Sequence, residues 1–387
     1  MARRDNELYR GKRRRLNVLA LALSALAMLA VAVIVLFYAF QQYIVFDQDG
    51  ISLELPLLAT PEAAVDESGE RVFEEVQVQL EIGEADYSNV EAVAGEGLEP
   101  LRAIFVPAAS VNSVSVQSYV NLMGSYNANA LVLEVKPTSG QLTWASSSET
   151  AEGFAVNGTQ NMAGLVQSLK EQDIYLVAQV SCLVDDLMSE RAATSALHLI
   201  DGSAYSDAQG GWMDPYSSTV VDYLTELCEE LAGYGFDEIL LKAVSLPVTE
   251  ASIHYNAALS YAPTPTTAVC TLAQTLSAAV RGAGAAVSAI IDSQPLAEGQ
   301  TALSGQDIGL FTKVFDRLCC YAATAWQAGA NADTLTAPMT VGDTSLRYAP
   351  IMNYAPEMSC YIIQVPSYLI GWRSRSRRRA RATCCSL

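Results

Sequence analysis

From residue 102 onward, short apolar runs alternate with longer segments that are apolar on one side only. Continuous apolar runs of about four to eight residues are typical of strands buried in a parallel sheet, and apolar positions recurring every three or four residues indicate helices. Strands are therefore predicted at residues 103–106, 130–135, 174–180, 238–241, 285–291, 317–321, 347–353 and 360–365. Helices are predicted at residues 114–126, 161–172, 217–234, 266–281 and 307–314.

Alternation of strands and helices predicts an α/β fold with a parallel sheet. Eight such units between residues 101 and 372 fit a (β/α)8 barrel of the TIM type, which typically needs about 250 residues. A doubly wound open sheet is the alternative. It is disfavoured because the glycine-rich stretch Arg281–Ala286 precedes a predicted strand, whereas a phosphate-binding loop follows one.

Residues 16–40 form an apolar run that is long enough to cross a membrane. At about 1.5 Å per residue, a helix of this length spans the hydrocarbon layer of roughly 30 Å. Seven Lys and Arg precede the run in residues 1–15, so the positive-inside rule predicts a cytoplasmic N-terminus and an extracytoplasmic domain after residue 41. We expect a single-pass protein of the cytoplasmic membrane. A cleaved signal peptide is the alternative, but its apolar region is shorter, at about 7–15 residues.

Charge is distributed unevenly along the chain. Between residues 16 and 372 there are ten Lys and Arg against forty Asp and Glu, a formal charge of about −30. Such a body repels nucleic acid, which argues against nucleic-acid binding. Residues 41–100 are acidic and predict a solvated linker with one strand at 72–82. The basic tail, residues 373–387, is predicted to be disordered, although it could also bind an anionic envelope polymer or lipid, or arise from out-of-frame translation.

The sequence predicts neither a metal centre nor a cofactor. The chain has eight cysteines and only two histidines, His198 and His254, and no two cysteines have the C-x2-C spacing of a zinc site. Most of the cysteines are therefore expected to be small buried hydrophobic residues.

Four stretches of the chain resemble motifs of one bacterial protein family. They are Leu131–Trp144 (LVLEVKPTSGQLTW), Leu165–Val180 (LVQSLKEQDIYLVAQV), Gly210–Tyr223 (GGWMDPYSSTVVDY) and Gly235–Pro247 (GFDEILLKAVSLP). The family consists of anchored or secreted (β/α)8 barrels that are similar to glycosyl hydrolases and are known largely as a domain of unknown function. The match covers about residues 102–325 in the family's order and spacing. The resemblance implies the barrel fold and a glycan ligand.

The chain departs from the family pattern at polar positions that follow the strands. Lys242 stands where the pattern has an aspartate at the end of the fourth strand, and Ser245 stands where it has an arginine. Gln179 replaces another arginine, and Asp292 follows the fifth strand two residues after the expected aspartate. Strand six keeps Asp316 but lacks the proline–tyrosine end.

Glu134 is the candidate catalytic acid or base. Glycoside hydrolysis needs two carboxyl groups, about 5–5.5 Å apart for retention of configuration and roughly 6.5–9.5 Å apart for inversion. Strand alternation predicts that Glu134 and Lys136 face the same side. If Lys136 and Lys242 both face the barrel mouth, they would pair with the carboxylates there and hold their pKa low. An ion-paired Glu134 is therefore the alternative to a catalytic one.

The other candidates are substrate-binding residues: Lys136, Trp212, Asp214, Tyr216, Lys242 and Asp292. Trp212 and Tyr216 could stack on a sugar ring, while Asp214 is most simply the N-cap of the following helix, with Pro215 at its first position. Asp185 and Asp186 are expected to begin a helix, with catalysis as the alternative reading. Lys242 could also be a Schiff-base lysine.

Two classes of function follow from these residues. The first is an active, membrane-anchored glycoside hydrolase that acts on wall glycan or exopolysaccharide. The second is a degenerate relative with weak or no activity that binds cell-envelope glycan. Replacement of the strand-four aspartate by Lys242 favours the second class, because a general acid needs a raised pKa and a nearby cation lowers it.

Overall fold

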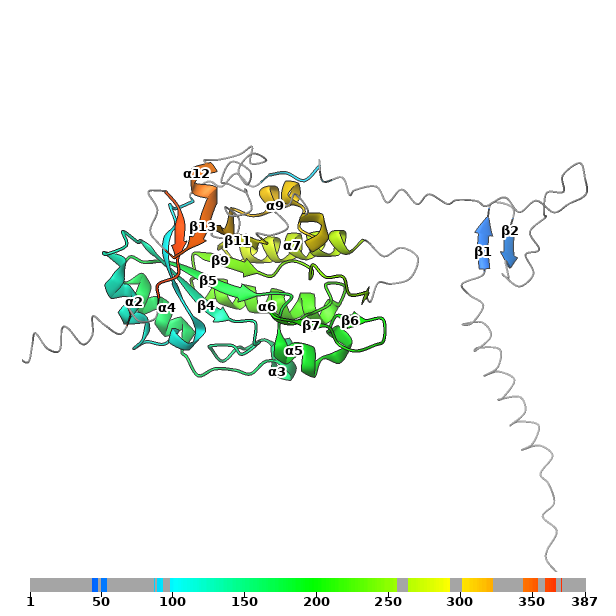
Figure 1. Cartoon of the computed structure of the whole chain (residues 1–387), viewed down its shortest axis with the longest axis horizontal. Coiled ribbons are helices and arrows are strands. Elements are labelled where there is room, and N and C mark those ends of the chain that lie inside the picture. Colours follow the sequence, from blue (N-terminus) through cyan, green and yellow to red (C-terminus); the bar gives the residue numbers. More distant parts are fainter. Residues whose placement is uncertain are drawn as a thin grey trace, which may run out of the picture. The chain divides into compact units, whose positions relative to one another are not determined.

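The structure is a computed structural model (Figure 1). It describes residues 44–47, 50–53, 87, 89–92, 98–255, 264–292, 301–322, 344–353, 359–366 and 370. The chain divides into two compact units, Met1–Gly83 and Glu84–Leu387. In the first unit, strands β1 (Ile44–Asp47) and β2 (Gly50–Leu53) form an antiparallel hairpin.

The second unit contains a closed barrel of eight parallel strands. They are β3 (Arg102–Val106), β4 (Ala130–Lys136), β5 (Tyr175–Ser181), β9 (Glu238–Lys242), β11 (Ala286–Ile291), β12 (Arg317–Tyr321), β13 (Tyr348–Met352) and β14 (Tyr361–Ile363). Each strand pairs with the next barrel strand along the chain, and β14 closes the ring onto β3. The predicted (β/α)8 barrel is confirmed, and its strands lie where the apolar runs predicted them.

Helices surround the strands (Figure 1). They are α2 (Val116–Met123), α4 (Met162–Lys170), α5 (Asp186–Arg191), α6 (Ser218–Gly233), α7 (Pro265–Gly282), α9 (Ile308–Val314) and α12 (Thr344–Arg347). Capping residues begin several of them: Asn161, Asp185, Thr264 and Asp307 each accept a hydrogen bond from a backbone N–H of the first turn. These side chains satisfy donors that the helix itself leaves unpaired.

Strand alternation separates two hydrophobic clusters. An inner cluster fills the barrel and includes Val132, Val177, Leu240, Cys319 and Ile362. A larger outer cluster packs the opposite faces of the strands against the helices. Side chains on the inner face of a strand therefore point into the barrel interior or, at the ends of the strand, toward one of the two barrel openings.

Three loops after the strands carry small elements. The loop after β4 holds α3 (Glu149–Phe154), and the loop after β5 holds α5, β6 (His198–Leu199), β7 (Ser206–Asp207) and β8 (Gly210–Gly211). The loop after β9 holds β10 (Ile253–His254), which pairs antiparallel with β6. The loops after β5 and β9 are therefore joined to each other. Three short 3-10 helices complete the described elements: Ala108–Ser110, Ala193–Ser195 and Thr301–Ser304.

Part of the predicted linker belongs to the barrel unit, which begins at residue 84. Lys313 on α9 donates a hydrogen bond to the carbonyl oxygen of Tyr87 at 2.8 Å. The β1–β2 hairpin also lies in the stretch that was predicted as linker. The predicted strand at 72–82, the apolar run 16–40 and the basic tail lie outside the described residues. No helix in the described part of the chain is both long and apolar enough to cross a membrane.

A buried ion pair fills the N-terminal end of the barrel. The Arg317 guanidinium lies 3.2 Å from the Glu238 carboxylate, and both side chains are fully buried. Tyr175 donates a hydrogen bond to the same carboxylate at 3.1 Å. Burial lowers the pKa of Arg317, but the charge of Glu238 outweighs burial and the net shift is upward. Two opposite charges in the barrel interior thus stabilise each other.

Replacing Arg317 by Met should lower the free energy of unfolding by about 3–5 kcal/mol, because it leaves Glu238 buried without a counter-charge. The double variant Arg317→Met/Glu238→Leu should lose less, since no charge is then left unpaired. Urea unfolding of both variants measures the difference. A double variant that is less stable than Arg317→Met would contradict this account.

Two glutamates of α6 hold the loop that follows β4. Glu230 accepts hydrogen bonds from the Trp144 indole and from Ser146 and Ser147. Glu226 accepts them from the hydroxyl groups of Ser148 and Thr150. Burial raises the pKa of Glu230, but these hydrogen bonds outweigh it, so the pKa lies below its ordinary value of 4.5.

Replacing Glu230 by Gln should cost about 1 kcal/mol at neutral pH, because charged acceptors make the stronger hydrogen bonds. The folded pKa of Glu230 is depressed, so its contribution is present above pH 4.5 and is lost as the pH falls through the folded pKa. Urea unfolding of the wild type and the variant should give different stabilities at neutral pH, and the difference should shrink as the pH falls below 4.5. A difference that does not change with pH would argue against the carboxylate.

Candidate functional site

The carboxyl ends of the barrel strands form the mouth, where (β/α)8 enzymes carry out their chemistry. Glu134 and Gln179 are register partners near the ends of β4 and β5, two residues beyond the inner-face pair Val132 and Val177. Lys242 ends β9, two residues beyond Leu240 of the inner cluster. Tyr321 ends β12 and packs on the same cluster, and Asp292 directly follows β11. These residues come from five of the eight strands.

Glu134 and Asp292 are the two carboxylates that the described strand ends bring to the mouth. Glu134 is half-buried, and its Oε2 accepts the backbone N–H of Ala108 at 3.0 Å. Burial raises the pKa of Asp292, and a hydrogen bond with Ser245 opposes the rise only in part. Ser245, which is itself almost fully buried, thus acts on this carboxyl group. A carboxyl group with a raised pKa is suited to donating a proton.

Tyr321 lies within the electrostatic range of both mouth carboxylates. Burial raises its pKa, and the charges of Glu134 and then of Asp292 contribute to the same shift. Both carboxylates therefore act electrostatically on one phenol, although they belong to strands that are not neighbours in the barrel.

Lys242 is half-buried on the inner face. None of the salt bridges among the described residues includes it. The next residue, Ala243, has a φ of 55°, in the left-handed region that an L-residue with a Cβ adopts only at a cost. Backbone strain of this kind clusters at functional sites. Among the described residues, no ion pair joins a lysine to Glu134 or Asp292. The predicted neutralisation of these carboxylates by a lysine is therefore not observed there.

The prediction that Lys136 faces the mouth together with Glu134 is wrong. The register of β4 on β5 shifts between these residues: Glu134 pairs with Gln179, but Lys136 pairs with Val180 of the outer cluster. The bulge moves Lys136 to the outer face, where it is fully buried. Simple alternation fails here because a bulge adds one residue to the strand.

Lys136 forms an ion pair with Asp185 behind the mouth. Its Nζ lies 2.7 Å from the Asp185 carboxylate and donates to the Ser181 carbonyl at 2.8 Å. The same Nζ lies 5.5 Å from the ring centre of Tyr223 on α6. Asp185 also caps α5 by accepting the Met188 N–H at 2.8 Å. Asp185 thus begins a helix, as predicted, and its partner shows that Lys136 has a structural role.

Gly140 lets the chain approach this ion pair. It has a φ of 77°, and a Cβ built on it would lie 2.0 Å from Oδ1 of Asp185. The glycine in the stretch Pro137–Gly140 is therefore required by the close approach of the backbone to Asp185.

The stretch around Trp212 differs from the prediction. Trp212 and Asp214 are each about 1% exposed, so neither side chain is available to a sugar from solution. Asp214 is not the N-cap of α6, which is Ser217; its Oδ1 instead accepts the Tyr216 N–H at 3.0 Å. Tyr216 is half-buried and packs edge-on against Tyr255 at 6.0 Å between ring centres. Of Trp212, Asp214 and Tyr216, Tyr216 is the one that is exposed enough to contact a ligand.

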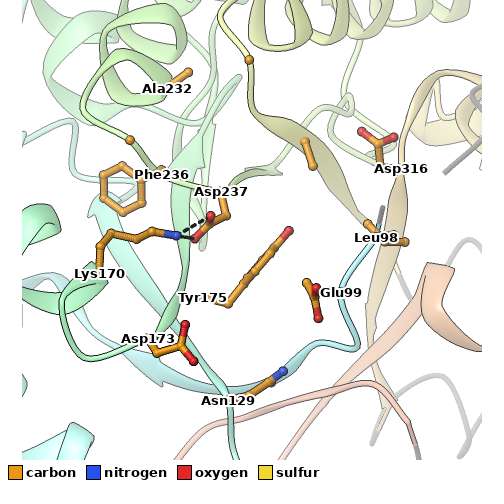
Figure 2. A pocket seen from close by; sticks show the side chains of 13 residues that line it. Leu98, Glu99, Asn129, Lys170, Asp173, Tyr175, Ala232, Phe236, Asp237 and Asp316 are labelled. Atoms are coloured by element: carbon orange, nitrogen blue, oxygen red, sulfur yellow. Dashed lines mark hydrogen bonds and ion pairs between the residues drawn. The ribbon is translucent and has the colours of Figure 1, made fainter. Parts of the chain in front are cut away.

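A cavity of about 780 Å³ lies at the other end of the barrel (Figure 2). Its lining includes Asp173, Asp237 and Asp316, which precede β5, β9 and β12. Figure 2 shows Lys170 beside Asp237, and the ion pair is 2.6 Å long. Asp316 pairs with Arg281 at 3.2 Å. Asp237 and Asp316 also accept the backbone N–H groups of Leu176 and Val287 and so hold the beginnings of β5 and β11 in place. This end of a barrel usually serves stability.

The described residues contain no group of three or more His, Cys, Asp and Glu that could hold a metal ion. Cys182, Cys228, Cys270, Cys319, Cys320 and Cys360 are free and buried.

Sequence reasoning missed Tyr321 at the mouth. It ends a predicted strand, so its inner-face position could have been found by counting alternation from Cys319. Asp185 was expected to begin a helix, with catalysis as the alternative, but its pairing with Lys136 was not predicted, because nothing along the chain indicates that Lys136 turns outward.

Lys136 and Lys242 should respond very differently to replacement by Met. Lys136→Met leaves Asp185 buried without its counter-charge and should cost about 3–5 kcal/mol of unfolding free energy. Lys242→Met removes no ion pair and should change stability by less than about 1 kcal/mol. Thermal and urea unfolding of the two variants give the comparison. Equal losses would mean that Lys242 has a structural partner.

Comparison with known proteins agrees with the geometry of the barrel. The glycoside hydrolase domain of PgaB (BpsB) from Bordetella bronchiseptica is 12% identical and covers 72% of this chain and 98% of its own, with a TM-score of 0.52. A hypothetical protein from Ruminiclostridium thermocellum is 22% identical over 48% of this chain and 96% of its own, with a TM-score of 0.42. None of the curated proteins matches the chain.

At 12% identity, the similarity to the PgaB domain supports the fold of this chain and nothing more. The family described as "Putative glycosyl hydrolase domain" matches residues 103–331, which is more than half of the chain. The match begins in β3 and extends past β12, so it includes both mouth carboxylates and Lys242. The chain belongs to this family of glycosyl hydrolase-like domains.

Proposed function

We propose that this chain is an extracytoplasmic, membrane-anchored barrel that binds cell-envelope glycan at its mouth and hydrolyses it weakly or not at all. The observation that carries the proposal is Lys242, a cation at the position where the family pattern has an aspartate. A lysine cannot act as the second carboxyl group of a glycosidase. The barrel and its mouth remain, so a binding function is retained.

Sequence supports the anchoring. Residues 16–40 are apolar over a length that suits a membrane span, and seven basic residues precede them. This arrangement puts the acidic barrel outside the cell. An extracytoplasmic barrel faces the polysaccharides of the envelope, which are the class of ligand that the family suggests.

An active hydrolase is the second candidate, and a specific observation favours it. Asp292 has a pKa raised by burial, and the carboxylate of Glu134 accepts a backbone N–H rather than a lysine. One carboxyl group suited to proton donation and one free of any ion pair with a lysine are the two groups that the reaction needs. In this case Asp292 would be the general acid and Glu134 the nucleophile or base.

The full-length chain in detergent should bind insoluble cell-envelope polysaccharide in a pull-down assay and release no reducing sugar from it. The variants Asp292→Asn and Glu134→Gln should still bind, because neither removes Lys242. Lys242→Asp alone should not create turnover, since Ser245 still occupies the position of the pattern's arginine.

Release of reducing sugar that Asp292→Asn or Glu134→Gln abolishes would establish the hydrolase instead. Folding of each variant is checked by its unfolding midpoint. Absence of both binding and turnover would reject both functions.

A further inference from the structure

Lys242 differs from the other lysines of the described chain in having no partner there. Lys136 pairs with Asp185 and Lys170 pairs with Asp237, and Lys313 donates to a carbonyl oxygen. Lys242 has neither an ion pair nor a hydrogen bond from its side chain among the described residues. A half-buried ammonium group is desolvated in part and gains from an anionic partner.

The two described carboxylates of the mouth do not supply that partner. Glu134 directs Oε2 to the Ala108 N–H, and Asp292 interacts with Ser245 while burial favours its neutral form. Gln179, two residues before the end of the neighbouring strand, is uncharged and almost fully buried, so it does not supply an anion either.

The backbone fixes Lys242 in this place. The carbonyl oxygens of Lys242 and Ala243 accept the N–H groups of Cys182 and Leu183 at 2.8 and 3.0 Å. These bonds tie the end of β9 to the loop after β5 and support the left-handed conformation of Ala243. The backbone at Lys242 is therefore already fixed, and only the side chain has to be ordered when a ligand binds.

We propose that Lys242 binds an acidic substituent of the glycan, a carboxylate or a phosphate group, and so selects acidic glycans over neutral ones. This inference rests on the proposed glycan-binding function. The body carries a formal charge of about −30, which repels a densely charged polymer. The ligand is therefore a mainly neutral glycan that carries isolated acidic groups.

Matched oligosaccharides test the proposal by isothermal titration calorimetry with the full-length chain. One pair is xylotetraose with and without a single 4-O-methylglucuronic acid, and the other is mannopentaose with and without a 6-phosphate. The wild type should bind the acidic member of one pair about tenfold more tightly, as a charge-assisted hydrogen bond in a partly desolvated site allows. The pair that shows the preference identifies the acidic group.

Variants assign the preference to Lys242. Lys242→Met should reduce it to less than about twofold, and Lys242→Arg, which keeps the charge, should retain most of it. Lys170→Met is the matched control, because it removes a lysine charge at the opposite end of the barrel, and it should leave the preference unchanged.

Equal binding of acidic and neutral members by the wild type, or a preference that survives in Lys242→Met, would overturn this inference and leave glycan binding standing. If no oligosaccharide binds while envelope polysaccharide is still retained in the pull-down, acidic selection at Lys242 is likewise rejected. Absence of binding in both assays removes the proposed function and this inference with it.

Discussion

The shift of register between Glu134 and Lys136 determines how the mouth is composed. Without this bulge both side chains would face inward and neutralise each other. With it, Lys136 turns outward to Asp185 at 2.7 Å, and Glu134 stays inside without a lysine. One extra residue in β4 thus builds the buried pair that supports the loop after β5 and leaves a carboxylate in the mouth.

Charged side chains form ion pairs at the N-terminal end of the barrel, whereas those described at the mouth do not. At the N-terminal end, Arg317 and Glu238 are fully buried and paired, and Asp237 and Asp316 beside the cavity pair with Lys170 and Arg281. At the mouth, neither Lys242 nor Asp292 is in an ion pair among the described residues, and the pKa of Asp292 is raised by burial. Paired charges stabilise the fold, whereas titratable groups outside ion pairs are available to a ligand.

Membership of a glycosyl hydrolase-like family does not decide whether the chain is a hydrolase, because activity belongs to the site and not to the fold. Here the site combines two carboxyl groups, Glu134 and Asp292, with a lysine where the family pattern has an acid. A lysine at a strand end is unsuited to the role of a second carboxyl group and suited to binding an anion. The same residue therefore carries both the proposed function and the proposed preference for acidic glycans.

The sequence by itself determined the barrel. Its strands are fully buried, so each appears as a continuous apolar run, and the glycines, prolines and capping residues between them mark the helix boundaries. Lys242 could also be placed at a strand end from local pattern alone. Tertiary structure alone decided that Lys136 and Trp212 are buried and that Asp292 and Glu134 share the surroundings of Tyr321. Register, burial and electrostatic neighbours depend on segments far apart in the chain, and no local pattern encodes them.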